Sequence, residues 1–210
     1  MTDSKKLNRR PVVFLDRDGT LNVEAGYIRQ LENLVLIEGA AQAVKLLNAA
    51  GVAAILITNQ SGAARGYYAE QHILDLNARL VRLLEEQGAR LDDVYYCPHL
   101  EEGSVPDYAL ACDCRKPAAG LADRAYCDHP DLDRTRSFVV GDKSTDVELA
   151  RNCGARGILV TTGYGDAVLK GEYQWPVEPD FLAASIVDAV DWILEQLELG
   201  HTSRSNRQEG

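Results

Sequence analysis

Acidic residues follow two apolar stretches of this sequence, at points where buried strands would end. Asp16 and Asp18 come after Val-Val-Phe-Leu, and Asp142 follows Phe-Val-Val-Gly. Side chains two positions apart on extended backbone point to the same side, so Asp16 and Asp18 would repel each other without a cation between them. Carboxylate oxygens suit Mg²⁺, and a carboxylate that the metal does not fully engage can act as a nucleophile. These residues indicate magnesium-assisted phosphoryl transfer, although an Asp-Gly turn or a helix cap would use the same residue types.

Residues suited to holding a phosphoryl group occur at two further places. Thr58 follows an apolar stretch and opens the run Thr-Asn-Gln-Ser-Gly, and Lys116 follows Arg115 directly before a proline. A hydroxyl and an ammonium group complement the charge of a transferring phosphoryl group. The simpler alternatives are a turn between a strand and a helix for the first segment, and a solvent-exposed basic pair for the second.

Four of the five cysteines lie between positions 97 and 127, two of them in the polar segment between 98 and 117. Cys-Pro-His and Cys-Asp-Cys together supply three thiols and one imidazole, which matches a closed Cys₃His zinc site of structural type. Such a site would hold together a loop that is long for one without regular structure. A rival set would include Cys127 and His129, and Cys153 is expected in the core. The expected zinc ligands are Cys97, His99, Cys112 and Cys114.

Apolar periodicity predicts the elements that position these residues. Short continuous apolar runs alternate with stretches of helical spacing, which is typical of a parallel sheet covered by helices on both faces. The expected strands are 12–15, 53–57, 94–96, 138–140 and 157–160. The expected helices are 40–50, 70–86, 121–126, 145–152 and 183–199. Ligands of such sheets bind beyond the carboxyl ends of the strands, where the acids and Thr58 lie.

The charge balance favours a small-molecule ligand. The 210 residues include 22 Lys and Arg against 32 Asp and Glu, a net charge of −10, which argues against general binding to nucleic acid or an anionic membrane. No apolar run approaches the ~20 residues of a membrane span, and no signal peptide is recognisable. We expect a cytoplasmic monomer with an extension over 1–10, one domain over 11–199 and a disordered tail over 200–210.

Four segments, in order, resemble the motifs of the haloacid dehalogenase-like phosphatases. They are Phe-Leu-Asp16-Arg-Asp18-Gly-Thr20, Ile-Thr58-Asn, Lys116-Pro and Gly-Asp142-x-x-x-Asp146. The resemblance implies a Rossmann-like three-layer α/β/α fold. Because no sizeable insertion follows the first strand or separates the second and third, no separate cap domain is expected.

The same resemblance implies a role for each motif residue. Asp16 would be the nucleophile that forms an aspartyl phosphate, and Asp18 the general acid and then the base. Mg²⁺ would be held by Asp16, the main-chain carbonyl of Asp18, and Asp142. Thr58 and Lys116 would hold the phosphoryl group. Asp146 would orient its neighbours from just outside the site.

The cysteine loop narrows the resemblance to the histidinol-phosphate and heptose-bisphosphate phosphatases, and Ser-Gly-x-Ala-Arg65-Gly lies closer to the latter. One departure is Lys-Pro-Ala-Ala-Gly-Leu, where that group commonly has Lys-Pro-x-Pro-Gly-Met. The heptose branch implies removal of the 7-phosphate of a heptose 1,7-bisphosphate in heptose precursor synthesis. The alternatives are a histidinol-phosphate phosphatase and a catalytically silent sugar-phosphate-binding module.

A bisphosphate substrate needs a second anion site, for which Arg65 or Arg115 is the candidate because a guanidinium fork suits phosphate. Either arginine could instead be an ordinary surface residue. The full set of expected substrate contacts is Thr20, Asn59, Gln60, Ser61, Arg65, Arg115 and Lys143.

Overall fold

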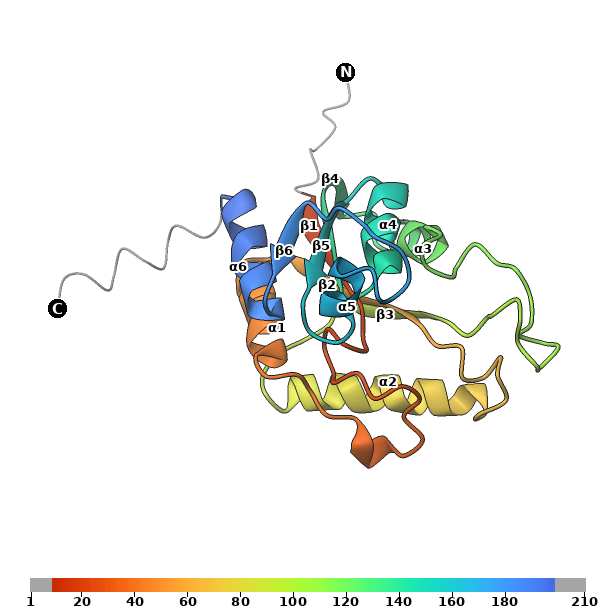
Figure 1. Cartoon of the computed structure of the whole chain (residues 1–210). Coiled ribbons are helices and arrows are strands. Elements are labelled where there is room, and N and C mark those ends of the chain that lie inside the picture. Colours follow the sequence, from red (N-terminus) through yellow and green to blue (C-terminus); the bar gives the residue numbers. More distant parts are fainter. Residues whose placement is uncertain (1–8, 199–210) are drawn as a thin grey trace, which may run out of the picture.

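In a computed structural model of the chain, which describes residues 9–198, six strands pair in parallel to form one sheet (Figure 1). The strands are β1 (Arg10–Leu15), β2 (Ala53–Asn59), β3 (Asp93–Cys97), β4 (Leu132–Gly141), β5 (Arg156–Val160) and β6 (Phe181–Ala183). Their order across the sheet is β3-β2-β1-β4-β5-β6. The order of winding reverses between the neighbours β1 and β4, and sheets of this topology bind ligands at the carboxyl side of that point.

Helices cover both faces of the sheet, which gives three layers. They are the short η1 (Leu31–Asn33), α1 (Ala40–Ala49), α2 (Glu70–Glu85), α3 (Gly120–Asp128), α4 (Ser144–Cys153), α5 (Gly165–Leu169) and α6 (Ile186–Gln196). Alternate residues of β1 face opposite layers, as the two-residue period of a strand requires. Val13 and Leu15 pack with α1, α2 and α6, whereas Val12 and Phe14 pack with α3 and α4.

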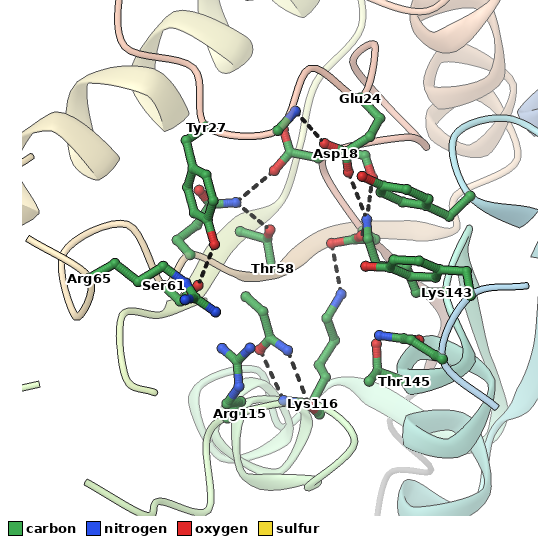
Figure 2. A pocket seen from close by; sticks show the side chains of 17 residues that line it. Asp18, Glu24, Tyr27, Thr58, Ser61, Arg65, Arg115, Lys116, Lys143 and Thr145 are labelled. Atoms are coloured by element: carbon green, nitrogen blue, oxygen red, sulfur yellow. Dashed lines mark hydrogen bonds and ion pairs between the residues drawn. The ribbon is translucent and has the colours of Figure 1, made fainter. Parts of the chain in front are cut away.

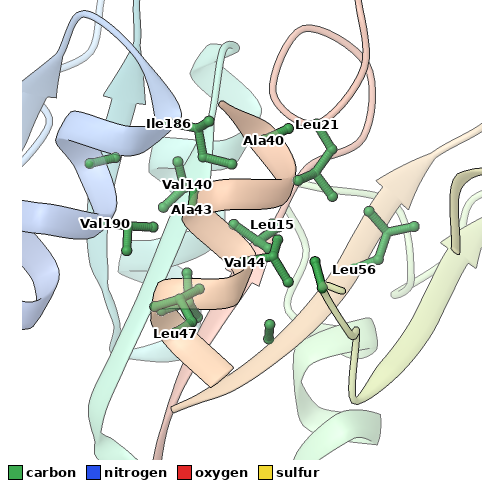
Figure 3. Packing of buried hydrophobic residues seen from close by; sticks show 14 of the residues in the cluster. Leu15, Leu21, Ala40, Ala43, Val44, Leu47, Leu56, Val140, Ile186 and Val190 are labelled. Carbon is green, nitrogen blue, oxygen red and sulfur yellow. The ribbon is translucent and has the colours of Figure 1, made fainter. Parts of the chain in front are cut away.

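The layer of α1 and α6 shows why the sheet is a rigid support. Ala43, Val44 and Leu47 of α1 pack in one cluster with the strand residue Val140 and the α6 residue Val190 (Figure 3). All of them are fully buried. Truncating a buried leucine in such packing to alanine costs about 2–5 kcal/mol, so the strand ends hold their positions firmly.

The expected fold class is confirmed, residues 9–198 include no separate cap domain, and the differences lie in small elements. The sequence reading missed β6 and α5. It also shortened β4, whose first half, Asp133–Arg136, is polar and solvent-accessible and so carries no apolar run. The last helix begins at Ile186 and not at 183, because Ala183 pairs in β6 and Ser185 caps the helix by accepting the Asp188 amide.

The expected domain limits are only partly within the described residues. Arg10 belongs to β1, so the expected extension over 1–10 overlaps the sheet by one residue. The rest of that extension up to residue 8, and the expected tail over 200–210, lie outside the described residues. Over residues 9–198, no helix combines the length and the hydropathy that crossing a membrane would need.

Candidate active site

The ends of β1 and β4 bring acidic residues from distant parts of the chain together. Leu15 pairs with Val140 in the sheet, so Asp16 and Asp142 leave neighbouring strands at the same edge. Carboxylate oxygens of Asp16, Asp142 and Asp146 lie within 4.8 Å of one another, and all three residues are buried. Like charges at this separation in a buried site require cations to balance them.

A hydrogen bond and close packing hold Asp142 within this cluster of like charges. The Tyr164 amide donates to its Oδ2 at 2.8 Å, and a Cβ on Gly19, which has φ of 84°, would collide with the same oxygen. Burial raises the pKa of Asp142 to about 7; Lys143 opposes that rise, and Asp16 and its other acidic neighbour add to it. A cluster of hard oxygens with this deficit of positive charge fits a divalent cation.

Lys116 supplies one positive charge from a segment a hundred residues away. Its Nζ donates to Oδ1 of Asp16 at 2.7 Å, to Oδ1 of Asp146 at 2.6 Å and to the Ile57 carbonyl at 3.0 Å. Burial alone would raise the pKa of Asp16, but the charges of Lys116 and Lys143 outweigh it and hold that pKa below its usual value. Burial would likewise lower the pKa of Lys116, yet the two aspartates raise it. The nucleophile candidate is therefore a carboxylate and its partner an ammonium group.

Asn59 fixes the main chain that carries Lys116. Its Nδ2 donates to the Lys116 carbonyl and its Oδ1 accepts the Lys116 amide, both at 3.0 Å. The expected contact of Asn59 with substrate stays a prediction. What the structure shows is a clamp between the end of β2 and the segment before α3.

Asp18 is surrounded by hydrogen-bond donors. Its Oδ2 accepts from Arg17 at 2.9 Å and from Gln60 at 2.8 Å, and its Oδ1 accepts from Asn22 at 2.9 Å. Gln60 also donates to Oγ1 of Thr58 and accepts from Arg17, so one amide joins both motifs. The expected role of general acid requires Asp18 to deliver a proton. In the structure, donors occupy its oxygens, and one must move before Asp18 can deliver a proton.

The sequence analysis did not predict a role for Arg17. It is almost fully buried, which is unusual for arginine, and it is the only residue that contacts Asp18 through two nitrogens within residues 9–198. The one signal in the sequence is a charged residue between two acids at the end of a buried strand. Its geometry makes Arg17 a positioning residue for Asp18.

These residues open into a cavity of about 260 Å³ at the carboxyl edge of the sheet (Figure 2). Most of the expected site residues line it: Asp16, Asp18, Thr58, Asn59, Gln60, Ser61, Arg65, Arg115, Lys116 and Lys143. Asp142 and Asp146 lie beneath the surface. Thr20 is also fully buried, is absent from the lining, and its hydroxyl has no hydrogen-bond partner in the described part of the chain. The geometry thus gives no support for a substrate contact by Thr20.

Other lining residues were not singled out from the sequence. Glu24 and Tyr27 come from the loop after β1. Tyr164, Tyr173 and Gln174 come from the region after β5, which carries no recognisable pattern. The complete set of such residues is Glu24, Gly26, Tyr27, Thr145, Tyr164, Tyr173 and Gln174.

The outer part of the cavity carries two arginines and a tyrosine. Figure 2 shows Arg65 and Arg115 reaching the same side of the cavity, near Ser61. Ser61 and Tyr27 share a hydrogen bond at 3.3 Å, and the Arg65 guanidinium lies over the Tyr27 ring at 5.9 Å. Arg115 donates to the His99 carbonyl at 3.0 Å, which attaches it to the cysteine loop. Both guanidinium groups are available to an anion that extends outward from Asp16.

The four expected zinc ligands meet at the base of the loop after β3. The sulfur of Cys114 lies 3.1 Å from that of Cys97, 3.2 Å from that of Cys112 and 3.3 Å from Nδ1 of His99. All three cysteines are free, and the four ligand atoms lie within 4.8 Å of one another. This donor set fits a tetrahedral zinc ion. The rival set is wrong for residues 9–198, since Cys127 is exposed and His129 pairs with Asp93.

Comparison with known proteins agrees with this geometry. A family model described as HAD-hydrolase-like matches residues 113–189. A D-glycero-D-manno-heptose-1,7-bisphosphate 7-phosphatase of Thermosynechococcus vestitus is 54% identical over 192 residues, covering 90% of this chain and 97% of the relative. The chain belongs to the heptose-bisphosphate phosphatase family. This confirms the resemblance to haloacid dehalogenase-like phosphatases seen in the motifs.

Further members of the heptose-bisphosphate phosphatase family match along nearly the whole chain. A D-glycero-beta-D-manno-heptose-1,7-bisphosphate 7-phosphatase of Haemophilus ducreyi is 41% identical over 186 residues, 88% of this chain and 98% of that protein. Among solved structures, the D,D-heptose 1,7-bisphosphate phosphatase of B. bronchiseptica, complexed with magnesium and phosphate, has a TM-score of 0.77. It is 26% identical and covers 89% of this chain and 99% of that one.

Proposed function

We propose that this protein is a magnesium-dependent phosphatase that removes the 7-phosphate of D-glycero-D-manno-heptose 1,7-bisphosphate, in the synthesis of nucleotide-activated heptose. The observation that carries the chemistry is the buried contact of Asp16 with Lys116 at 2.7 Å on the floor of the cavity. The substrate is supported by relatives of that name at 54% and 41% identity over most of the chain.

The reaction proceeds in two steps on the chain's own residues. In the first, a carboxylate oxygen of Asp16 bonds to phosphorus while the bond from phosphorus to the sugar oxygen breaks, and Asp18 protonates that oxygen. In the second, Asp18 takes a proton from water, which attacks the phosphorus and frees Asp16. Lys116 and Thr58 hold the phosphoryl oxygens during both steps.

The divalent ion and Asp146 complete this arrangement. Asp16, the main-chain carbonyl of Asp18, and Asp142 would hold Mg²⁺, which when bound supplies positive charge to the phosphoryl oxygens. Asp146 acts on the reaction through its neighbours: it accepts from Nζ of Lys116 and from the main-chain amide of Lys143. It therefore sets the position of both lysines.

Selection of a bisphosphate rests on the outer part of the cavity. Arg65 is exposed, and Arg115 is half-buried against the cysteine loop. Either guanidinium can receive the second phosphate as a bidentate pair. The variants Arg65→Ala and Arg115→Ala distinguish the two candidates. Replacement of the arginine that binds the second phosphate should abolish the enzyme's preference for the bisphosphate over the 7-monophosphate.

The cysteine loop would bind a structural zinc ion, because four protein ligands leave no open coordination position. We also propose a cytoplasmic monomer that acts on a small molecule and binds neither nucleic acid nor membrane. Free thiols at Cys97, Cys112 and Cys114 support a reducing compartment.

The test is phosphate release with Mg²⁺ from heptose 1,7-bisphosphate, heptose 7-phosphate and histidinol phosphate. We expect the bisphosphate to give the highest kcat/KM, with loss of the 7-phosphate seen by phosphorus NMR. A higher kcat/KM for histidinol phosphate would overturn the substrate assignment. Binding of the bisphosphate without release of phosphate would instead favour a silent binding module.

A further inference from the structure

Lys143 places its ammonium group among the oxygens expected to bind the metal. Its Nζ lies 2.9 Å from Oδ1 of Asp142, 3.1 Å from the main-chain carbonyl of Asp18 and 3.7 Å from Oδ2 of Asp16. A fourth contact, at 3.1 Å, is made with Oε2 of Glu24. The first three are the groups assigned to Mg²⁺, so one lysine already faces the whole ligand set.

An ammonium group and a magnesium ion cannot both use these oxygens. Mg²⁺ requires oxygen ligands at about 2.0–2.1 Å in nearly octahedral geometry. The protons of Lys143 point at the same lone pairs, and the two cations repel each other at this range. We propose that Lys143 is a tethered competitor of the divalent ion, which holds the carboxylates together before the metal binds and must leave them when it does.

The structure also indicates where Lys143 goes. Its side chain lines the cavity, while its main-chain amide is fixed at the start of α4 by Oδ2 of Asp146. The long side chain can therefore turn toward the cavity without moving the helix, and its contact with Glu24 lies on that side (Figure 2). There the released ammonium group meets the phosphate of a bound ligand.

This displacement couples two binding events. Metal binding releases a cation for the phosphate, and a phosphate that attracts Lys143 clears the oxygens for the metal. Such coupling is reciprocal, so each ligand strengthens the other by the same factor. The inference rests on the proposed divalent-ion site, and it assigns to Lys143 the control of when that site is free.

The experiment measures Mn²⁺ binding by the loss of its free electron paramagnetic resonance signal, with no substrate present. We expect Lys143→Met to bind Mn²⁺ roughly tenfold more tightly than the wild type. The exposed Lys170→Met is the matched control and should leave the affinity unchanged. Equal or weaker affinity of Lys143→Met would overturn the inference, whereas no Mn²⁺ binding by any variant would overturn the proposed metal site itself.

Inorganic phosphate supplies the second half of the test. Saturating phosphate should tighten Mn²⁺ binding by a larger factor in the wild type than in Lys143→Met, because the variant has no ammonium group to transfer. Equal factors would refute the coupling. If Lys143→Met does not fold without metal, Lys143→Gln keeps a polar side chain with hydrogen-bond donors, one atom shorter, but not the charge. Its melting temperature should then rise more with Mn²⁺ than that of the wild type, and an equal rise would count against the proposal.

Discussion

Two polar clusters lie at the carboxyl edge of the sheet, and they are held together in opposite ways. The carboxylates of Asp16, Asp142 and Asp146 come from the end of β1, the end of β4 and the first turn of α4, and are balanced by lysine ammonium groups at 2.6–2.9 Å. The thiols of Cys97, Cys112 and Cys114 lie at the end of β3 and in the loop after it, and they have sulfur and imidazole neighbours at 3.1–3.8 Å. The first cluster carries its own counter-charges, whereas the second depends on an ion for its strongest bonds. Loss of the metal should therefore abolish activity at the carboxylate cluster, and it should destabilise the cysteine loop.

The largest effect is expected from Asp16→Asn. An amide cannot form the aspartyl phosphate, so kcat should fall by a factor on the order of 10⁴ to 10⁶. Lys116 keeps its contact with Asp146, so the fold and the binding of substrate should persist. Phosphate release, circular dichroism and titration calorimetry measure these quantities. Turnover within tenfold of the wild type would remove Asp16 from the role of nucleophile.

Arg17→Met should act on the same cluster through Asp18. Without Arg17 the Asp18 carboxyl group is no longer held in position to protonate the leaving oxygen, so kcat for a sugar phosphate should drop about 100-fold. p-Nitrophenyl phosphate has a leaving group that needs no proton, and its hydrolysis should fall much less. Asn77→Ala is the matched control, because it removes another partner of Arg17 without touching Asp18. Equal losses on both substrates would show that Arg17 is only structural.

Cys112→Ser tests the cysteine loop. The variant should bind less zinc and melt about 5–10 °C lower, because the ion contributes to folding directly. Removal of Mg²⁺ from the wild type should abolish activity with a smaller change in melting temperature. Cys153→Ser, outside the cluster and bonded to the Ala150 carbonyl, is the control. Unchanged zinc content in Cys112→Ser would refute the proposed ligand set.

A pH dependence of zinc affinity is expected at the cysteine loop. In the metal-free loop, burial raises the pKa of Cys114 to about 11 and raises that of Cys97 further. Burial also acts to raise the pKa of Cys112. Hydrogen bonds from the other two thiols outweigh that effect and bring the pKa of Cys112 below its usual value. Zinc binds thiolates, so thiols that are protonated at neutral pH must release their protons. Affinity should therefore fall as pH decreases from 8 to 6, by roughly 100-fold per unit if two protons are released. Competition with a zinc chelator at several pH values measures this, and a flat profile would be inconsistent with it.

How far the sequence could predict the molecule depended on how local each signal was. Asp16 and Asp142 directly follow β1 and β4, and Thr58 is the second-last residue of β2; the apolar run that precedes each of them is visible directly in the sequence. β6 could not be found, because it has three residues and Leu182 in its centre is 46% exposed.

The same distinction holds within the site. Motif residues could be named because their types and order carry the chemistry. The roles of Asn59 and Gln60 could not, since an amide bonds whatever the fold brings near it: Asn59 clamps a residue 57 positions away, and Gln60 joins Asp18 to Thr58. The position of Lys143 among the metal ligands likewise depends on the turn into α4.

The hydrogen bonds between Asn59 and Lys116 have a consequence for how the two clusters respond to oxidation. Cys114 stands two residues before Lys116, and Arg115 between them is bonded to the His99 carbonyl. An oxidant that converts these thiols to sulfenic acid or to a disulfide would pull on the backbone that carries the lysine. The proposed hydrolysis at Asp16 involves no redox chemistry. Because of this short connection, however, oxidation of the cysteine cluster would also impair the phosphatase activity.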